Sequence, residues 1–258
     1  MAVPADPSGR ERAVLVTGVP GNIGSYFAEH APPRFRLRLM AQREDERTRA
    51  LSSRGEIVVG DLADLTRLTA HCRGIDTIVH LAADPSPDAT WDELLEPNIV
   101  GAYHLFAAAK AAGCRRVVFA SSVHAVLGYP DDHQVRTDDA VNPANLYGVT
   151  KCFGEALGRY YAEQQGLSVI AIRIGAFQPL AALHQDWFRG FAHGFVSQRD
   201  LIDLICRCID DDGCRFAIVH GLSDNRFKCL DLTDTRDRFG YHPQDDAFRE
   251  LESDRPPA

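Results

Sequence analysis

The stretch "AVLVTGVPGNIGS", residues 13–25, joins a short apolar run to three glycines, Gly18, Gly21 and Gly24. The apolar run predicts a buried strand, and the residues after the glycines predict a helix. Glycines at this G-x-x-G-x-x-G spacing allow a sharp turn, a close approach of the backbone to a diphosphate, and tight packing of helix on strand. The stretch therefore predicts a strand, a phosphate-binding turn, and a helix whose amino end faces a dinucleotide.

The same alternation of strand and helix continues along the chain. Further apolar, β-rich runs occupy residues 36–40, 56–60, 76–82, 116–122 and 168–175. Amphipathic helical patterns lie between them, at residues 21–30, 44–53, 64–72, 91–112 and 147–165. Strands that alternate with helices indicate right-handed crossovers and a parallel sheet covered on both faces. We therefore expect an α/β fold, a Rossmann-type doubly wound parallel sheet, over residues 13–175.

The two ends of the chain depart from this rhythm. Residues 1–12 are polar and contain no apolar signal segment, so we expect a disordered tail. Beyond residue 175 come an aromatic-rich loop, a helical pattern at 198–210 and a strand pattern at 216–221. We expect residues 176–258 to form a small substrate-binding appendage packed on the main domain. The long polar connection 123–146 follows a strand, where such loops commonly shape a site.

Composition and charge narrow the classes of partner. The 258-residue chain carries a formal net charge of -8, which argues against nucleic-acid binding. No apolar run approaches the ~20 residues that span a bilayer. Seven cysteines without a C-x-x-C pair indicate reduced thiols and a cytoplasmic protein, and the histidines show no metal-ligand spacing. We expect a small-molecule partner and no metal.

The end of the second predicted strand bears on cofactor choice. An NAD-selective site places Asp or Glu there, which accepts a hydrogen bond from the ribose 2′-hydroxyl. The stretch "RLRLMAQRED" instead offers Gln42 and Arg43, and Arg43 can hold a 2′-phosphate. The alternative is that Arg43 belongs to the solvated face of the next helix. The pattern favours NADP over NAD.

Other candidate cofactor contacts follow the third and fourth strands. Asp61 can accept from an adenine amino group, or it can cap the helix that begins near Asp64. Ala82 and Ala83 are small enough for the backbone to pass close to a cofactor, although small residues in a turn need no function. Neighbouring candidates in the predicted cofactor-binding segments are Pro20, Asn22, Ile23, Leu62, Leu81 and Ile174.

A possible set of reacting groups lies further along the chain. "FASSVH" places Ser122 at the end of the fifth predicted strand, and "NLYGVTK" places Tyr147 and Lys151 one helical turn apart. A nearby ammonium lowers the pKa of a phenol, so this tyrosine can act as an acid or base while serine holds the substrate oxygen. A Tyr/Lys pair at this spacing can also be purely structural, and the upstream glycines and serine favour catalysis.

The segments "TGVPGNIG", "GDLAD", "HLAA", "FASSVH" and "YGVTK" together resemble the extended short-chain dehydrogenase/reductase, or NAD-dependent epimerase/dehydratase, superfamily. The resemblance spans residues 12–175 and implies catalysis by Ser122, Tyr147 and Lys151, with the lysine also holding the nicotinamide ribose. It implies a role for Asn98, which can otherwise be a helix cap. It also implies a homodimer through the helices predicted at 91–112 and 147–165.

Within that superfamily the chain is most similar to the uronate dehydrogenase group, which oxidises a sugar acid to a lactone. "IRIG", "VHGLSDN" and "FGYHPQDDAF" resemble segments of that group, and His124 matches a substrate-contacting histidine. Several positions depart from its pattern: Val123 replaces an asparagine, Ala176 a serine, and the arginine expected to bind a carboxylate falls near Gln185. Arg189 is a candidate replacement for that arginine, or an ordinary solvated loop residue.

Three functions fit these observations. The first is an NAD(P)-dependent oxidoreductase that acts on a hydroxyl or carbonyl of a sugar-like small molecule. The second is an epimerase, dehydratase or reductase of a nucleotide-linked sugar, for which the carboxyl-terminal region is short. The third is a non-catalytic dinucleotide sensor, which the retained Tyr147 and Lys151 argue against.

Overall fold

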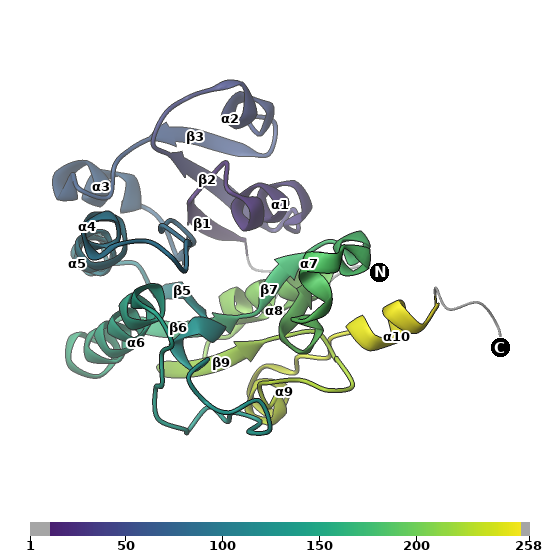
Figure 1. Cartoon of the computed structure of the whole chain (residues 1–258). Helices are drawn as coiled ribbons and strands as arrows, with labels where there is room; N and C mark the ends of the chain where they lie inside the picture. The colour runs from purple at the N-terminus through teal and green to yellow at the C-terminus, as the bar shows by residue number, and fades with distance from the viewer. Residues whose placement is uncertain (1–10, 254–258) are drawn as a thin grey trace.

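The computed structural model describes residues 11–253, without the side chains of Trp187 and Arg189. Its centre is a seven-stranded parallel sheet in the order β3-β2-β1-β4-β5-β6-β9 (Figure 1). The strands are β1 (Arg12–Thr17), β2 (Phe35–Ala41), β3 (Gly55–Val59), β4 (Thr77–His80), β5 (Arg116–Ser122), β6 (Ser168–Ile174) and β9 (Phe216–Gly221). From β1 the chain adds β2 and β3 on one side of the sheet and then β4, β5, β6 and β9 on the other side. This reversal of strand order confirms the predicted doubly wound fold.

Helices cover both faces of the sheet (Figure 1). One face carries α3 (Leu65–Cys72), α5 (Gly101–Ala111) and α6 (Leu146–Gln165), which pack side by side. The other face carries α1 (Asn22–His30) and α8 (Gln198–Asp210). The short α2 (Glu46–Ala50) connects β2 to β3.

One predicted helix is interrupted. The pattern at residues 91–112 becomes α4 (Trp91–Leu94), a π-helical segment Leu95–Val100, and then α5. Thr90 caps α4 in a capping box with Glu93. The helical segment predicted at 91–112 is therefore confirmed over residues 91–111, with π-helical in place of α-helical hydrogen bonding around Asn98.

The chain beyond β6 contributes to two layers. β9 is the last strand of the main sheet, and α8 packs on that sheet. A smaller layer contains the parallel pair β7 (Ala176–Gln178) and β8 (Phe195–Ser197), with α7 (Asp186–Arg189) and α10 (Ala247–Ser253). Its separate apolar cluster includes Leu183, Phe188, Phe195 and Ala247. The remaining elements are α9 (Thr233–Phe239) and 3-10 turns at Val123–Ala125, Leu180–His184 and Ala192–Gly194.

The main core lies on both sides of the sheet. Successive side chains of a strand point to opposite faces, so Val14 and Val16 of β1 join one buried cluster while Leu15 joins the other. Within residues 11–253, no helix is long and apolar enough to cross a membrane.

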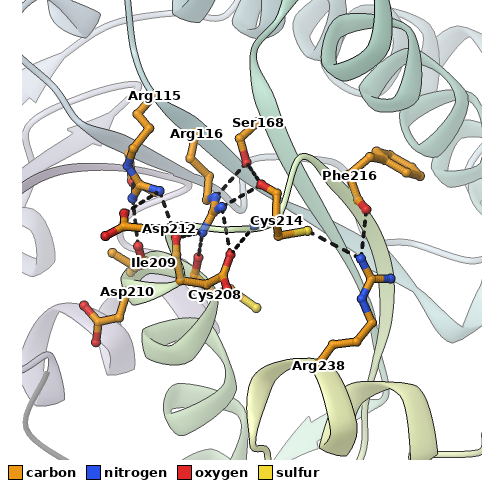
Figure 2. Close-up of polar contacts among 12 residues, drawn as sticks. Arg115, Arg116, Ser168, Cys208, Ile209, Asp210, Asp212, Cys214, Phe216 and Arg238 are labelled. Atoms are coloured by element: carbon orange, nitrogen blue, oxygen red, sulfur yellow. Dashed lines mark hydrogen bonds and ion pairs between the residues drawn. The ribbon is translucent and has the colours of Figure 1, made fainter. Parts of the chain in front are cut away.

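Arginines close the amino-terminal edge of the sheet (Figure 2). Three of them donate to the last carbonyls of α8: Arg116 to Cys208 at 2.7 Å, Arg115 to Ile209 at 2.8 Å, and Arg12 to Asp210 at 3.2 Å. Carbonyls at the end of a helix lack intrahelical partners and attract cations. These contacts tie α8 to the amino ends of β1 and β5, and the opposite edge of the sheet carries the site described below.

Replacing Arg116 tests this closure. Its guanidinium is buried and bonds Ser168, Cys208, Cys214 and the Asp211 carboxylate. Arg116→Met removes these hydrogen bonds and leaves the Asp211 carboxylate without its guanidinium partner, so we expect the free energy of unfolding in urea to fall by about 3–5 kcal/mol. The control Arg136→Met removes an exposed pair with Asp138 and should leave the free energy of unfolding nearly unchanged. Equal, small losses in both variants would contradict the role given to Arg116.

Candidate active site

The glycine turn after β1 is crowded by its own backbone and by the end of β4. Gly18 has a φ of 80°, and a Cβ there would lie 2.7 Å from the Ala82 nitrogen. A Cβ at Gly21 or at Gly24 would lie 2.7 Å from the Gly18 carbonyl oxygen. The positive φ and the lack of room for a side chain explain the three glycines. The turn leads directly into the amino end of α1, where free N–H groups favour an anion.

Thr17 joins the ends of β1 and β4 beside this turn. Its hydroxyl oxygen accepts from the Leu81 and Ala82 N–H groups, both at 3.2 Å, and bonds His80 Nδ1 at 2.8 Å. Burial, with a smaller effect of the Lys151 charge, lowers the pKa of His80 to about 3, so this imidazole is neutral. The backbone of Leu81 and of Ala82, one of the two alanines predicted to let the backbone pass close to a cofactor, is thus held in place by Thr17 of β1.

A cleft of about 730 Å³ opens along this edge of the sheet. Its lining includes nine of the predicted cofactor residues, namely Gly18, Pro20, Gly21, Gln42, Arg43, Asp61, Leu62, Ala82 and Ala83. Predicted residues outside that lining are Asn22, Ile23, Gly24, Leu81, Asn98, Tyr147, Lys151 and Ile174. The first four of these belong to the same turns. The cleft therefore collects the residues expected around the phosphates and the adenosine of a dinucleotide.

The predicted ribose end of the cleft carries arginines. Arg43 is 87% exposed and lies 3.9 Å from the Asp45 carboxylate, and Arg47 donates to the Pro20 carbonyl at 2.8 Å. Asp45 also lines the cleft, but its Oδ1 accepts from the Thr48 N–H and hydroxyl, both at 2.9 Å, as the cap of α2. Asp45 is thus engaged in local structure, while both arginines border the cleft.

Asp61 lies at the end of β3 and borders the same cleft. Its Oδ1 accepts from the Ala63 N–H at 2.9 Å, whereas Asp64 accepts from the Arg67 N–H and caps α3. The alternative that Asp61 caps this helix is therefore wrong.

Ser122, Tyr147 and Lys151 meet where β5 ends and α6 begins, and all three are buried. Lys151 Nζ donates to the Ala120 carbonyl at 2.9 Å and lies 5.4 Å from the centre of the Tyr147 ring. Burial lowers the pKa of Lys151 to about 8. Burial also raises the pKa of Tyr147; a hydrogen bond with Ser122 opposes this rise, and the Asp84 charge adds to it.

His124 is held beside this group by Asn145, the residue that caps α6. Asn145 Oδ1 accepts from the Gly148 N–H at 2.8 Å, which leaves its Nδ2 to donate to His124 Nδ1 at 2.8 Å. His124 Nδ1 is thus an acceptor, and Nε2 carries the proton of a neutral ring. Burial lowers the pKa of His124, and its ring lies edge-on to Tyr147 with 5.3 Å between centroids. His124 can therefore donate a hydrogen bond from Nε2.

Asn98 lies in the π-helical segment and links two parts of the site. Its side chain exchanges hydrogen bonds with the Asp84 N–H and carbonyl, at 2.8 and 3.0 Å, and donates to Thr150 Oγ at 3.1 Å. The alternative of a helix cap is wrong for this residue. Asn98 instead fixes the loop after β4 to the helix that carries Tyr147 and Lys151.

The remaining predicted residues lie around this centre. Val123 and Ile174 are buried in the main apolar cluster, where their side chains pack. The side chain of Arg189, the candidate carboxylate ligand, lies outside the described residues. Among residues 11–253, no three His, Cys, Asp or Glu side chains are grouped so that they could hold a metal ion.

A buried ion pair between Glu155 and Arg173 lies next to the group formed by Ser122, Tyr147 and Lys151. Glu155, one turn after Lys151, receives two hydrogen bonds from Arg173 of β6, both at 2.9 Å, and one from Ser121 at 2.6 Å. The pair thus joins α6 to β5 and β6 directly next to Ser122. Because both partners are almost fully buried, it fixes how α6 lies on the sheet.

Four residues of the site were not among the predicted ones: Thr17, Asp84, Asn98's partner Thr150, and Asn145. Asn145 could have been found, since an asparagine directly before a predicted helix is a typical amino-terminal cap. The others depend on contacts between distant segments and leave no local pattern.

Proteins with a glycine turn after the first strand of a doubly wound sheet bind dinucleotides at that turn, and the geometry places this chain in that class. The family model described as NAD dependent epimerase/dehydratase matches residues 14–177, and the chain belongs to this family.

Two curated relatives are similar over nearly the whole chain. An NAD-dependent glucose-6-phosphate dehydrogenase from Haloferax volcanii is 36% identical over 253 residues, 92% of this chain and 95% of the relative. An L-arabinose 1-dehydrogenase (NAD(P)(+)) from the same organism is 34% identical, over 93% and 99% of the two chains. Among solved structures, a uronate dehydrogenase mutant from Agrobacterium tumefaciens complexed with NAD is 30% identical, with a TM-score of 0.80 over 96% of this chain and 91% of that one.

The close contact of α6 with the turn after β5 can be tested at Gly148. A Cβ there would lie 2.2 Å from the His124 carbonyl oxygen, so Gly148→Ala must push α6 away from β5. We expect a loss of about 1–3 kcal/mol in the free energy of unfolding. The fraction of activity lost should exceed the fraction of stability lost. Gly213→Ala is the control, because nothing lies within 4 Å of a Cβ at that position. A fully active Gly148→Ala variant of unchanged stability would contradict the described packing.

Proposed function

We propose that this chain is an NAD(P)-dependent oxidoreductase that moves hydride between a nicotinamide and a hydroxyl or carbonyl carbon of a sugar-like small molecule. The observation that carries the proposal is the meeting of Ser122, Tyr147 and Lys151 at the same sheet edge as the dinucleotide-sized cleft. The names of the relatives, dehydrogenases of glucose 6-phosphate and of L-arabinose, support it.

In this proposal Tyr147 moves the proton and its neighbours prepare it. A bound nicotinamide supplies the hydride acceptor or donor. The Tyr147 phenolate takes the proton of the substrate hydroxyl, or the phenol returns it in the reverse direction. Burial raises the pKa of Tyr147, and the Lys151 ammonium, 5.4 Å from the centre of its ring, would offset this effect by stabilising the phenolate. The Ser122 hydroxyl holds the substrate oxygen. The Lys151 ammonium donates one of its three protons to the Ala120 carbonyl, so the other two can bond the nicotinamide ribose.

His124 and the chain after β6 would complete the substrate site. The neutral His124 ring presents an N–H donor from Nε2 beside Tyr147, which suits a substrate oxygen. Within residues 176–258, β9 belongs to the main sheet and α8 packs on it, so we assign substrate binding to the smaller layer of β7, β8, α7 and α10, with Arg189 retained as a candidate contact. The main domain, residues 13–175, would hold the cofactor.

We propose NADP in preference to NAD. The end of β2 presents Gln42 and Arg43 to the cleft, and Arg47 joins them from α2. Asp45, an acid that lines the same end of the cleft, uses its Oδ1 as a helix cap. Two guanidinium groups at the end of β2 suit a 2′-phosphate. An Asp or Glu at the same place would bind the ribose 2′-hydroxyl of NAD and repel that phosphate.

We also propose a homodimer that forms through α4–α5 and α6. Exposed apolar side chains lie on these helices, namely Trp91, Leu95 and Tyr103 on the first and Leu146, Val149 and Tyr160 on the second. Large exposed apolar groups on neighbouring helices are typical of a protein interface.

The seven free thiols suit a cytoplasmic setting.

The catalytic assignment is tested by reduction of NAD⁺ and NADP⁺, followed as absorbance of the reduced cofactor, with aldoses, hexuronates and secondary alcohols. We expect activity with a sugar, and Tyr147→Phe should lower kcat by at least about 100-fold, because general acid–base catalysis contributes 10²–10⁴-fold. Tyr160→Phe, a change on the exposed side of α6, serves as the matched control. Equal activity in wild type and Tyr147→Phe would sink the mechanism.

The cofactor assignment is tested at the two arginines. We expect Arg43→Ala and Arg47→Ala each to weaken NADP binding by about tenfold and to leave NAD binding nearly unchanged, because only NADP carries the 2′-phosphate. Calorimetric titration of both cofactors gives the two Kd values. Arg49→Ala, an exposed arginine of α2 that does not line the cleft, is the control. An unchanged ratio of the two affinities would show that no 2′-phosphate is held there.

A further inference from the structure

Asp84 is a fixed carboxylate in the cleft. It opens the "DPSP" turn after β4 and borders the cleft on the side of Glu96 and Pro97. Its backbone N–H and carbonyl are both bonded by the Asn98 side chain, at 2.8 and 3.0 Å. Its Oδ1 accepts from the Ser86 N–H at 2.9 Å, which orients the carboxylate. Asp84 therefore has a defined position without being buried.

The loop that carries Asp84 packs on the reacting tyrosine. Ala89 and Leu94, a few residues further on, form a buried cluster with Tyr147. Asn98, which clamps Asp84, also donates to Thr150, the residue before Lys151. The Asp84 charge adds to the effect of burial in raising the pKa of Tyr147. Asp84 thus belongs to the surroundings of the reacting groups.

The Asp84 carboxylate can accept further hydrogen bonds from a ligand. Within the described residues, the Asp84 carboxylate receives one hydrogen bond, at Oδ1 from the Ser86 N–H, and forms no ion pair. The structural role of Asp84 uses only its backbone and Oδ1. An ionised carboxylate is purely an acceptor, so Oδ2 can bind a hydroxyl donor and repels a second anion.

We propose that Asp84 is a specificity-determining residue that selects neutral aldoses and excludes sugar acids. The inference rests on the proposed function, since it assumes a sugar beside Tyr147. A hydroxyl next to the reacting carbon donates to Asp84 Oδ2 in a charge-assisted hydrogen bond. A carboxylate on the same sugar ring cannot move far from the reacting carbon, so two like charges meet in a partly desolvated site. Such repulsion against the wrong ligand is a common source of specificity.

The test compares matched pairs of sugars, glucose with glucuronate and galactose with galacturonate, in wild type and Asp84→Asn. Asparagine keeps the Oδ1 acceptor for the Ser86 N–H and removes the charge. We expect wild type to have the higher kcat/KM for the aldose of each pair. Asp84→Asn should lower the ratio of aldose to uronate kcat/KM by at least about tenfold, through a loss for the aldose and a gain for the uronate.

Asp88→Asn, an exposed aspartate in the same loop, should leave that ratio unchanged and controls for net charge. A wild type that prefers the uronate, or an Asp84→Asn variant with the wild-type ratio, overturns the role of Asp84 and leaves the proposed function standing. Absence of cofactor reduction with every sugar overturns the proposed function and this inference together.

Discussion

The site depends on how closely α6 lies against the sheet. A Cβ at Gly148, Gly154 or Gly158 would stand 2.2 Å from the His124 carbonyl oxygen, 2.2 Å from the Phe119 ring and 2.9 Å from a Val169 methyl group. Without side chains at these positions the helix packs directly on β5 and β6, which brings Tyr147 and Lys151 to the end of β5. The Glu155–Arg173 pair then fixes the rotation of the helix, since a buried bidentate pair tolerates little displacement.

The amino edge of the sheet contributes to stability, and the carboxyl edge carries the site. At the amino edge, arginines donate to the last carbonyls of α8 and fix this helix to the sheet. At the carboxyl edge, the reversal of strand order between β1 and β4 separates two loops and opens a crevice between them. The glycine turn and the Asp84 loop border that crevice, and β5 ends at the same edge of the sheet, so this edge supplies both the cofactor cleft and the reacting groups.

Most of the fold followed from local patterns in the sequence. The apolar run 116–122 matches β5 residue for residue, and the glycine triplet lies at the turn that it predicts, because burial and backbone crowding act on neighbouring residues. The π-helical turn at Asn98 was not predictable, since it accompanies side-chain bonds to Asp84 and Thr150, 14 and 52 residues away. Asp84 was likewise missed, because only the folded loop brings it beside Tyr147.

Hydride transfer to the cofactor is the central claim, and deuterium labelling tests it most directly. An aldose substrate carrying deuterium on the reacting carbon is incubated with the enzyme and oxidised cofactor, and both products are analysed by NMR. Hydride transfer from the sugar places deuterium on the nicotinamide ring in step with net formation of the oxidised sugar, at a slower rate than with the unlabelled sugar. Deuterium that returns to the sugar with no accumulation of reduced cofactor would contradict it and would identify an epimerase.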